Sequence, residues 1–159
     1  MQEQIIILDF GSQYTQVIAR RIRECKVYST ILPYNTSAKE IASMNPKGLI
    51  LSGGPMSVYS RNAPLPDKEI FNLGLPVLGI CFGLQVIAKF MGGNVERGLK
   101  REYGKGSLSV KDGRCALFKG LPKSLQIWNS HGDKITKLPD LSLIHISEPT
   151  RPERIAYAV

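Results

Sequence analysis

The 159-residue chain has few of the residues that build metal centres, disulfide frameworks or membrane spans. Its three cysteines, Cys25, Cys81 and Cys115, are odd in number, far apart and without metal-site spacing. A reduced cytosolic compartment suits such a set better than a disulfide framework. No apolar run reaches the length of a membrane span, and the N-terminus lacks a signal-peptide layout. We therefore expect a cytoplasmic, single-domain protein without a metal site or a membrane contact.

Nucleotide-binding and nucleic-acid-binding signals are also weak. Gly11 and Ser12 follow an apolar segment, but neither the GxGxxG nor the Walker A spacing occurs. The formal net charge is +8, yet the basic residues are spread from Arg20 to Arg154. They are not interleaved with aromatic side chains, as they are on single-strand binding platforms. The sequence does not predict nucleic-acid binding.

Short apolar segments alternate with helical patterns over the first ninety residues. Because buried parallel strands are continuously apolar and their crossovers are helical, this order predicts an α/β fold with three layers and a mostly parallel sheet. After Gly93 the segments shorten and alternate, which predicts added antiparallel strands in the C-terminal third. The expected strands are 4–10, 27–32, 48–51, 76–80, 106–110 and 124–128, and the expected helices are 13–24, 37–44, 67–73 and 84–90.

Cys81 lies where an apolar strand runs directly into a helix, which is the layout of a nucleophile elbow. Gly79 and Gly83 stand on either side, where a side chain would crowd the turn. We expect the N-terminus of the helix to lower the pKa of the Cys81 thiol and to favour the thiolate. The alternative interpretation is a buried structural cysteine.

Three glycine-containing loops are expected at the carboxyl ends of the strands, where ligands of such sheets bind. They are residues 10–12, 52–54 and 81–83. A thiolate that attacks an acyl carbon needs donors for the developing oxyanion. The N–H of Phe82 is the usual first donor in an elbow, and the Gly53-Gly54 turn is the candidate for the second.

Five segments carry a resemblance to the class I glutamine amidotransferases, and the similarity covers about residues 4 to 140. The resemblance implies a flavodoxin-like fold in which Cys81 attacks the side-chain amide of glutamine. Ammonia leaves, and water hydrolyses the resulting γ-glutamyl thioester. The resemblance further implies that Gly54 and Phe82 form the oxyanion hole, and that Gly53, Gln85, Ser130 and His131 hold the substrate. The segments are 7–16 (ILDFGSQYTQ), 51–55 (LSGGP), 79–85 (GICFGLQ), 101–104 (REYG) and 128–134 (WNSHGDK).

Residues 7–16 and 128–134 are similar to one branch of that family in particular. In this branch the ammonia passes to an ATP-pyrophosphatase domain or subunit, which uses ATP and Mg²⁺ to aminate XMP to GMP. The resemblance therefore implies the glutaminase part of a ligase of purine biosynthesis, a homodimer when complete, with no cofactor in this domain. Two alternatives remain open: another class I amidotransferase, and a non-catalytic regulatory module that binds glutamine or a partner.

The resemblance stops after Asp140. We expect an amidotransferase domain over 1–140, incomplete at its C-terminal end, and a tail over 141–159 from outside the family. Residues 141–152 (LSLIHISEPTRP) resemble a translated sequencing adaptor, although a divergent strand is the alternative.

The expected loss of the C-terminal part of the domain would also remove the base that activates Cys81. The family's activating histidine belongs to a His-Pro-Glu motif, which this sequence lacks. His131 is expected in a substrate-side loop, and neither His145 nor Glu148 has the spacing to replace the motif. We therefore expect little glutaminase activity from this chain, and an exposed sheet edge.

Overall fold

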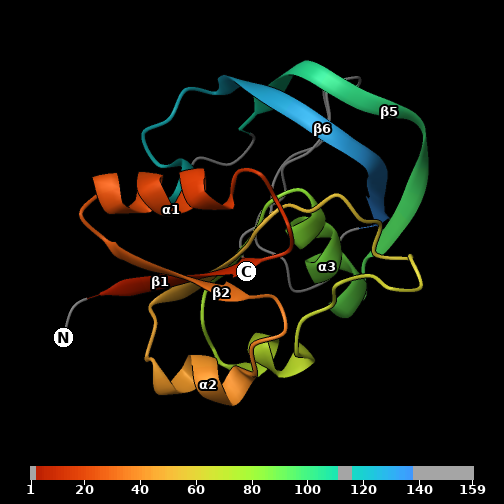
Figure 1. Ribbon diagram of the computed structural model, residues 1–159. Helices are drawn as coiled ribbons and strands as arrows, with labels where there is room; N and C mark the ends of the chain where they lie inside the picture. Colours follow the sequence, from red (N-terminus) through yellow and green to blue (C-terminus); the bar gives the residue numbers. More distant parts are fainter. Residues whose placement is uncertain (1–2, 111–115, 138–159) are drawn as a thin grey trace.

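A four-stranded parallel sheet forms the centre of the computed structural model, which describes residues 3–110 and 116–137 (Figure 1). The order of its strands is β2-β1-β3-β4. Ile6 of β1 is level with Thr30 on one side and with Leu49 on the other. The expected strands are confirmed, with bounds β1 (Gln4–Asp9), β2 (Tyr28–Pro33), β3 (Gly48–Leu51) and β4 (Val77–Gly79).

Helices cover the two faces of this sheet. Helix α1 (Thr15–Glu24) and helix α2 (Ala38–Ser43) lie on opposite sides in Figure 1. Ile6 and Leu8 of β1 join one buried cluster with residues of α2 and of α3 (Phe82–Phe90), so these two helices share a face. The intervening Ile7 is fully buried and belongs to the other face, because successive side chains of a strand alternate. The expected three-layer α/β fold is confirmed.

Two side-chain caps explain where the short helices begin. The Ser37 hydroxyl accepts a hydrogen bond from the Glu40 N–H at 3.2 Å, which starts α2. The Asp67 carboxylate accepts from the Glu69 N–H at 3.0 Å and from the Ala38 N–H at 2.9 Å. Asp67 therefore caps η1 (Lys68–Asn72) and also fixes this element against α2. The expected helix over 67–73 is a 3₁₀-helix of five residues.

The C-terminal third forms a two-stranded antiparallel ribbon of β5 (Asn94–Ser109) and β6 (Ser124–Lys137). The short strands expected at 106–110 and 124–128 are thus parts of two much longer ones, with η2 (Ala116–Phe118) between them. Val95 of β5 and Ile135 of β6 are buried in the same cluster as α3. The ribbon therefore packs onto the helix that follows the elbow.

The tail expected over 141–159, and with it His145 and Glu148, lies outside the described residues. A domain boundary at residue 140 stays a prediction. Within 3–110 and 116–137, no helix has the length and apolar character to cross a bilayer.

Candidate active site around Cys81

The backbone at Cys81 has the strained geometry of a nucleophile elbow. Cys81 has φ 53° and ψ −109°, a conformation that non-glycine residues rarely adopt, and it caps the N-terminus of α3. The Ile80 N–H donates to the Leu51 carbonyl at 2.9 Å, which ends β4 beside β3. The Gly83 N–H then donates to the Ser52 carbonyl at 3.0 Å. These bonds fold the chain back sharply and confirm the strand–turn–helix layout.

The two flanking glycines are required by space. A Cβ on Gly83 would lie 2.2 Å from the Leu51 carbonyl oxygen, and a Cβ on Gly79 would lie 2.6 Å from the backbone nitrogen of Leu84. Both distances are far below any real Cβ contact. The expectation that side chains would crowd this turn is therefore confirmed, and the absence of Cβ atoms lets α3 start directly against β3.

Three loops meet beside Cys81 at the carboxyl ends of β1, β3 and β4. The position that a Cβ on Gly53 would take lies 3.5 Å from the Cys81 Cβ and 3.5 Å from the Ser12 hydroxyl oxygen. On the next residue, a Cβ on Gly54 would lie 2.6 Å from the Phe10 carbonyl oxygen. Since β2 and β3 lie on opposite sides of β1, this is the point where the strand order reverses, and ligands of doubly wound sheets bind there.

The protonation of Cys81 differs from the sequence expectation. Burial raises the pKa of the Cys81 thiol above its ordinary value of 9.0, and the backbone N–H of Phe82, which favours the thiolate, only partly offsets this effect. The expectation of a lowered pKa is therefore wrong for the described chain. The helix N-terminus is present, but the cost of placing a thiolate in a largely buried position outweighs it. Cys81 is a protonated thiol at neutral pH.

Gln85 lies one turn into α3 and is 7% exposed. Its side-chain oxygen is fully buried and receives no hydrogen bond from the described residues. A buried carbonyl oxygen without a donor costs about 1–3 kcal/mol, so the Gln85 side chain carries an unpaired acceptor near the start of α3.

Ser130 and His131 lie in β6, where their backbones pair with Tyr103 and Glu102. The expectation that His131 occupies a loop is wrong, because the segment is part of the long ribbon. The positions of the Ser130 and His131 side chains relative to Cys81 lie outside what the structure describes. Cys81, Gly53, Gly54 and Phe82 are brought together, and the contribution of β6 to the site stays a prediction.

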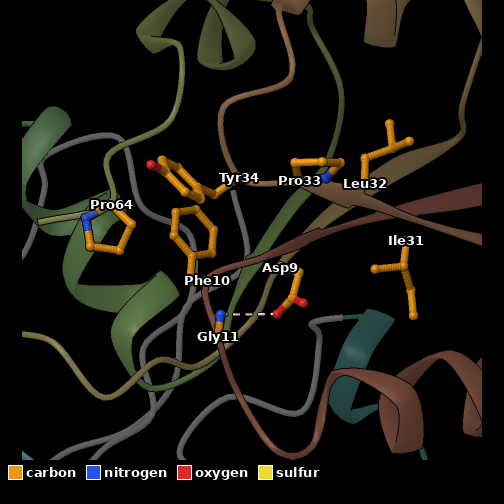
Figure 2. A pocket seen from close by; sticks show the side chains of 8 residues that line it. All are labelled: Asp9, Phe10, Gly11, Ile31, Leu32, Pro33, Tyr34 and Pro64. Atoms are coloured by element: carbon orange, nitrogen blue, oxygen red, sulfur yellow. Dashed lines mark hydrogen bonds between the residues drawn. The ribbon is translucent and has the colours of Figure 1, made fainter.

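A pocket of about 500 Å³ opens beside this site, at the ends of β1 and β2 (Figure 2). Figure 2 shows the ring of Phe10 beside that of Tyr34, with their centroids 5.9 Å apart. The Phe10 ring also lies 5.5 Å from the Phe82 ring. The pocket shares Phe10 and Gly11 with the first loop, whereas Cys81 and the loops 52–54 and 81–83 do not line it; the lining residues are Asp9, Phe10, Gly11, Ile31, Leu32, Pro33, Tyr34 and Pro64.

Two polar residues that the sequence did not single out organise the loops. The Asp9 carboxylate accepts a hydrogen bond from the Gly11 N–H at 3.0 Å (Figure 2). It also accepts one from the Thr15 hydroxyl at 2.8 Å, and the two bonds shape the turn after β1. Ser52 is completely buried and bonds to two of the loops through its hydroxyl. The Asp-x-Gly spacing is a recognisable turn signal. Ser52 lies in the segment LSGGP, but nothing in that segment indicates which groups its hydroxyl would bind.

Metal-binding side chains are not clustered in the described part of the chain. Within 3–110 and 116–137, no group of three or more histidine, cysteine, aspartate or glutamate side chains is arranged to hold an ion.

The chain belongs to the class-I glutamine amidotransferase family, whose sequence profile ("Glutamine amidotransferase class-I") matches residues 6–157. Among the proteins with this domain, the chain is highly similar to GMP synthases. It is 57% identical over 136 residues to the GMP synthase [glutamine-hydrolyzing] of Borreliella burgdorferi (strain N40). The aligned residues cover 86% of this chain and 27% of that relative. It is 55% identical over 140 residues to the GMP synthase of Chlorobaculum tepidum, and this alignment covers 87% of this chain and 27% of that relative. The chain thus spans about a quarter of these curated relatives.

Solved structures give the same fold. A protein from Thermoplasma acidophilum, described as one subunit of GMP synthase, superposes with a TM-score of 0.74 and 27% identity, over 99% of this chain and 84% of that one. A glutamine amidotransferase from Thermotoga maritima superposes with a TM-score of 0.66 over 89% of this chain and 65% of that one. At 22% identity, the second likeness shows the fold alone.

Proposed function

We propose that this chain is the glutamine-hydrolysing part of a GMP synthase and that Cys81 is its nucleophile. The Cys81 sulfur attacks the side-chain amide carbon of glutamine once the thiol has lost its proton. The carbon–nitrogen bond breaks, ammonia leaves with the proton it requires, and a γ-glutamyl thioester remains. Water then hydrolyses the thioester to glutamate and regenerates the thiol.

The observation that carries this proposal is the backbone strain at Cys81. A non-glycine residue at φ 53° and ψ −109° costs on the order of 1–3 kcal/mol, and such strain concentrates at functional sites. The strained turn places the Cys81 thiol at the start of α3, beside the Gly53-Gly54 turn. Gly54 and Phe82 are the proposed oxyanion donors, and Gly53, Gln85, Ser130 and His131 are the proposed contacts of glutamine.

The acceptor of the ammonia is proposed from the relatives. The two bacterial relatives are GMP synthases that hydrolyse glutamine, and this chain matches about a quarter of their length. We assign the amination of XMP to an ATP-pyrophosphatase domain or subunit, which uses ATP and Mg²⁺. We also propose that the complete protein is a homodimer.

The raised pKa of the Cys81 thiol supports slow turnover of glutamine by this 159-residue chain. A buried thiol needs a base to accept its proton, and the one histidine among the proposed site residues is His131, which we place on the substrate side. The same observation favours a second candidate function, a module that binds glutamine without hydrolysing it. The two functions differ in whether Cys81 becomes covalently modified.

The test uses 6-diazo-5-oxo-L-norleucine, an electrophilic analogue of glutamine. We expect it to label Cys81 and to be blocked by L-glutamine but not by D-glutamine. We also expect glutamate release to be slow, to increase when free imidazole supplies a base, and to be absent in Cys81→Ala. Glutamine binding without any label on Cys81 would support the binding module instead. Turnover as fast as that of an intact synthase would refute the proposed lack of a base.

A further inference from the structure

Ser52 connects all three loops around Cys81. Its hydroxyl accepts a hydrogen bond from the Phe10 N–H at 3.0 Å and donates one to the Gly53 carbonyl at 2.9 Å. Its own carbonyl accepts from the Gly83 N–H at 3.0 Å, within the elbow. The residue is 0% exposed, so none of these groups can exchange its partner for water.

The bond from the Ser52 hydroxyl fixes the orientation of the peptide group between Gly53 and Gly54. In a trans peptide the C=O and the N–H point in opposite directions. Because the Gly53 carbonyl is held toward the buried hydroxyl, the Gly54 N–H must point away from it. That N–H donates to no atom of the described residues 3–110 and 116–137.

Without the hydroxyl, this peptide group could rotate. Gly53 and Gly54 carry no Cβ atoms, so the backbone on both sides of the peptide has wide conformational freedom. The Phe10 carbonyl, 2.6 Å from where a Cβ on Gly54 would stand, leaves no room for a stiffer residue there. The orientation therefore depends on the Ser52 hydrogen bond rather than on side-chain packing.

We propose that Ser52 is a positioning residue for the oxyanion hole, which holds the Gly54 N–H toward the oxygen of the substrate carbonyl during attack by Cys81. The inference rests on the proposed function, because it needs an acyl carbon at Cys81. An oxyanion donor acts only when it is oriented before the reaction, and a displacement of about 1 Å costs about 100-fold in rate.

The test compares two reactions of the same thiol in the full 159-residue chain. With the γ-p-nitrophenyl ester of L-glutamate, the Cys81 sulfur attacks the γ-carbonyl, the C–S bond forms, and p-nitrophenolate leaves. This reaction passes through an oxyanion. With iodoacetamide, the sulfur displaces iodide and no oxyanion develops. Both rates are measured at one mildly alkaline pH, by mass spectrometry of the peptide that contains Cys81.

We expect Ser52→Ala to slow acylation about 100-fold and to leave alkylation within about twofold of wild type. Ser29→Ala is the matched control. Ser29 is also buried, at 7% exposure, and its hydroxyl donates to the Ala19 carbonyl at 3.0 Å. It lies on β2, away from the three loops, so its loss should change neither rate. Ser52→Cys, of similar size with a weaker donor, should give an intermediate acylation rate and serves if Ser52→Ala does not fold.

Three outcomes would overturn the inference. Equal acylation of wild type, Ser52→Ala and Ser52→Cys would show that the hydroxyl does not orient the donor. An equal fall of acylation and alkylation in Ser52→Ala would show that Ser52 only maintains the local fold. A wild-type chain that is alkylated but never acylated would overturn the proposed function as well, since no oxyanion hole would then exist.

Discussion

Replacing Gly83 by alanine tests the tight contact between the elbow and β3. The added Cβ would lie 2.2 Å from the Leu51 carbonyl oxygen and 2.6 Å from the Leu51 Cβ, whereas real Cβ contacts stay above 3.0 Å. Leu51 is completely buried, so it has no free volume to move into. The N-terminus of α3 must therefore shift away from the sheet by roughly 1 Å.

Two costs add up in this variant. Overpacking of a well-packed core costs about 1–3 kcal/mol. The shift also stretches the bonds from the Gly83 N–H to the carbonyls of Ser52 and Ile80, both 3.0 Å long, at about 0.5–1.5 kcal/mol each. The free energy of unfolding should thus fall by about 2–6 kcal/mol, a substantial part of the roughly 5–15 kcal/mol typical of a domain. For a chain of this size, the melting temperature should fall by about 4–24 °C.

Urea denaturation followed by circular dichroism measures this change, with Gly92→Ala as the matched control. Gly92 has φ +81°, and nothing lies within 4 Å of the Cβ it would carry. Its substitution therefore adds only backbone strain, about 1–2 kcal/mol. We expect Gly83→Ala to be clearly the less stable of the two. If both variants unfold at the same urea concentration, the contact between α3 and β3 is looser than the structure indicates.

Three further predictions concern the elbow and the caps. Cys81→Gly should raise the free energy of unfolding by about 1 kcal/mol, because glycine adopts φ 53° without strain. A variant that unfolds at a lower urea concentration than wild type would contradict this. Hydrogen bonds from the N–H groups of Ala38 and Glu69 lower the pKa of Asp67 below its ordinary 3.8, so Asp67→Ala should destabilise the fold at neutral pH. The difference in stability between wild type and Asp67→Ala should disappear as the pH falls below 3.8, because only the ionised carboxylate provides this stabilisation. Melting curves at several pH values test this, and a difference that stays constant with pH would contradict it. Alkylation of Cys81 should accelerate steadily with pH beyond 9.0, with the exposed Cys25 as a reference thiol in the same sample.

The parallel sheet could be predicted because its strands are short segments rich in apolar residues, each with a glycine or a proline at its end or within two residues after it. Gly48–Leu51 is expected and observed with the same bounds. The ribbon of β5 and β6 could not be predicted in full. Its residues are largely polar and charged, and Asn94 pairs with Lys137, 43 positions later in the chain. Local hydrophobic patterns do not reveal such distant pairing, which is set by the partner strand.

The same distinction between locally determined features and features that depend on distant parts of the chain applies to the site. Cys81, Gly79 and Gly83 could be identified because the elbow imposes its requirements within five residues. The role of the Ser52 hydroxyl could not, since its partners Phe10 and Gly53 belong to loops that only the sheet brings together. The pKa of Cys81 was also beyond the sequence, because it depends on how deeply the folded chain buries the sulfur.

The alkylation experiment decides between two physical effects at Cys81 with opposite signs. If the N-terminus of α3 dominated, the pKa of the thiol would lie near neutrality, and the rate would reach a plateau by about pH 8. Burial dominates instead, so the thiol stays protonated until the pH exceeds 9.0. The alkylation rate, which follows the thiolate fraction, should then rise about tenfold per pH unit between pH 7 and 9. A plateau in that range would refute the dominance of burial and would remove the need for a base beside Cys81.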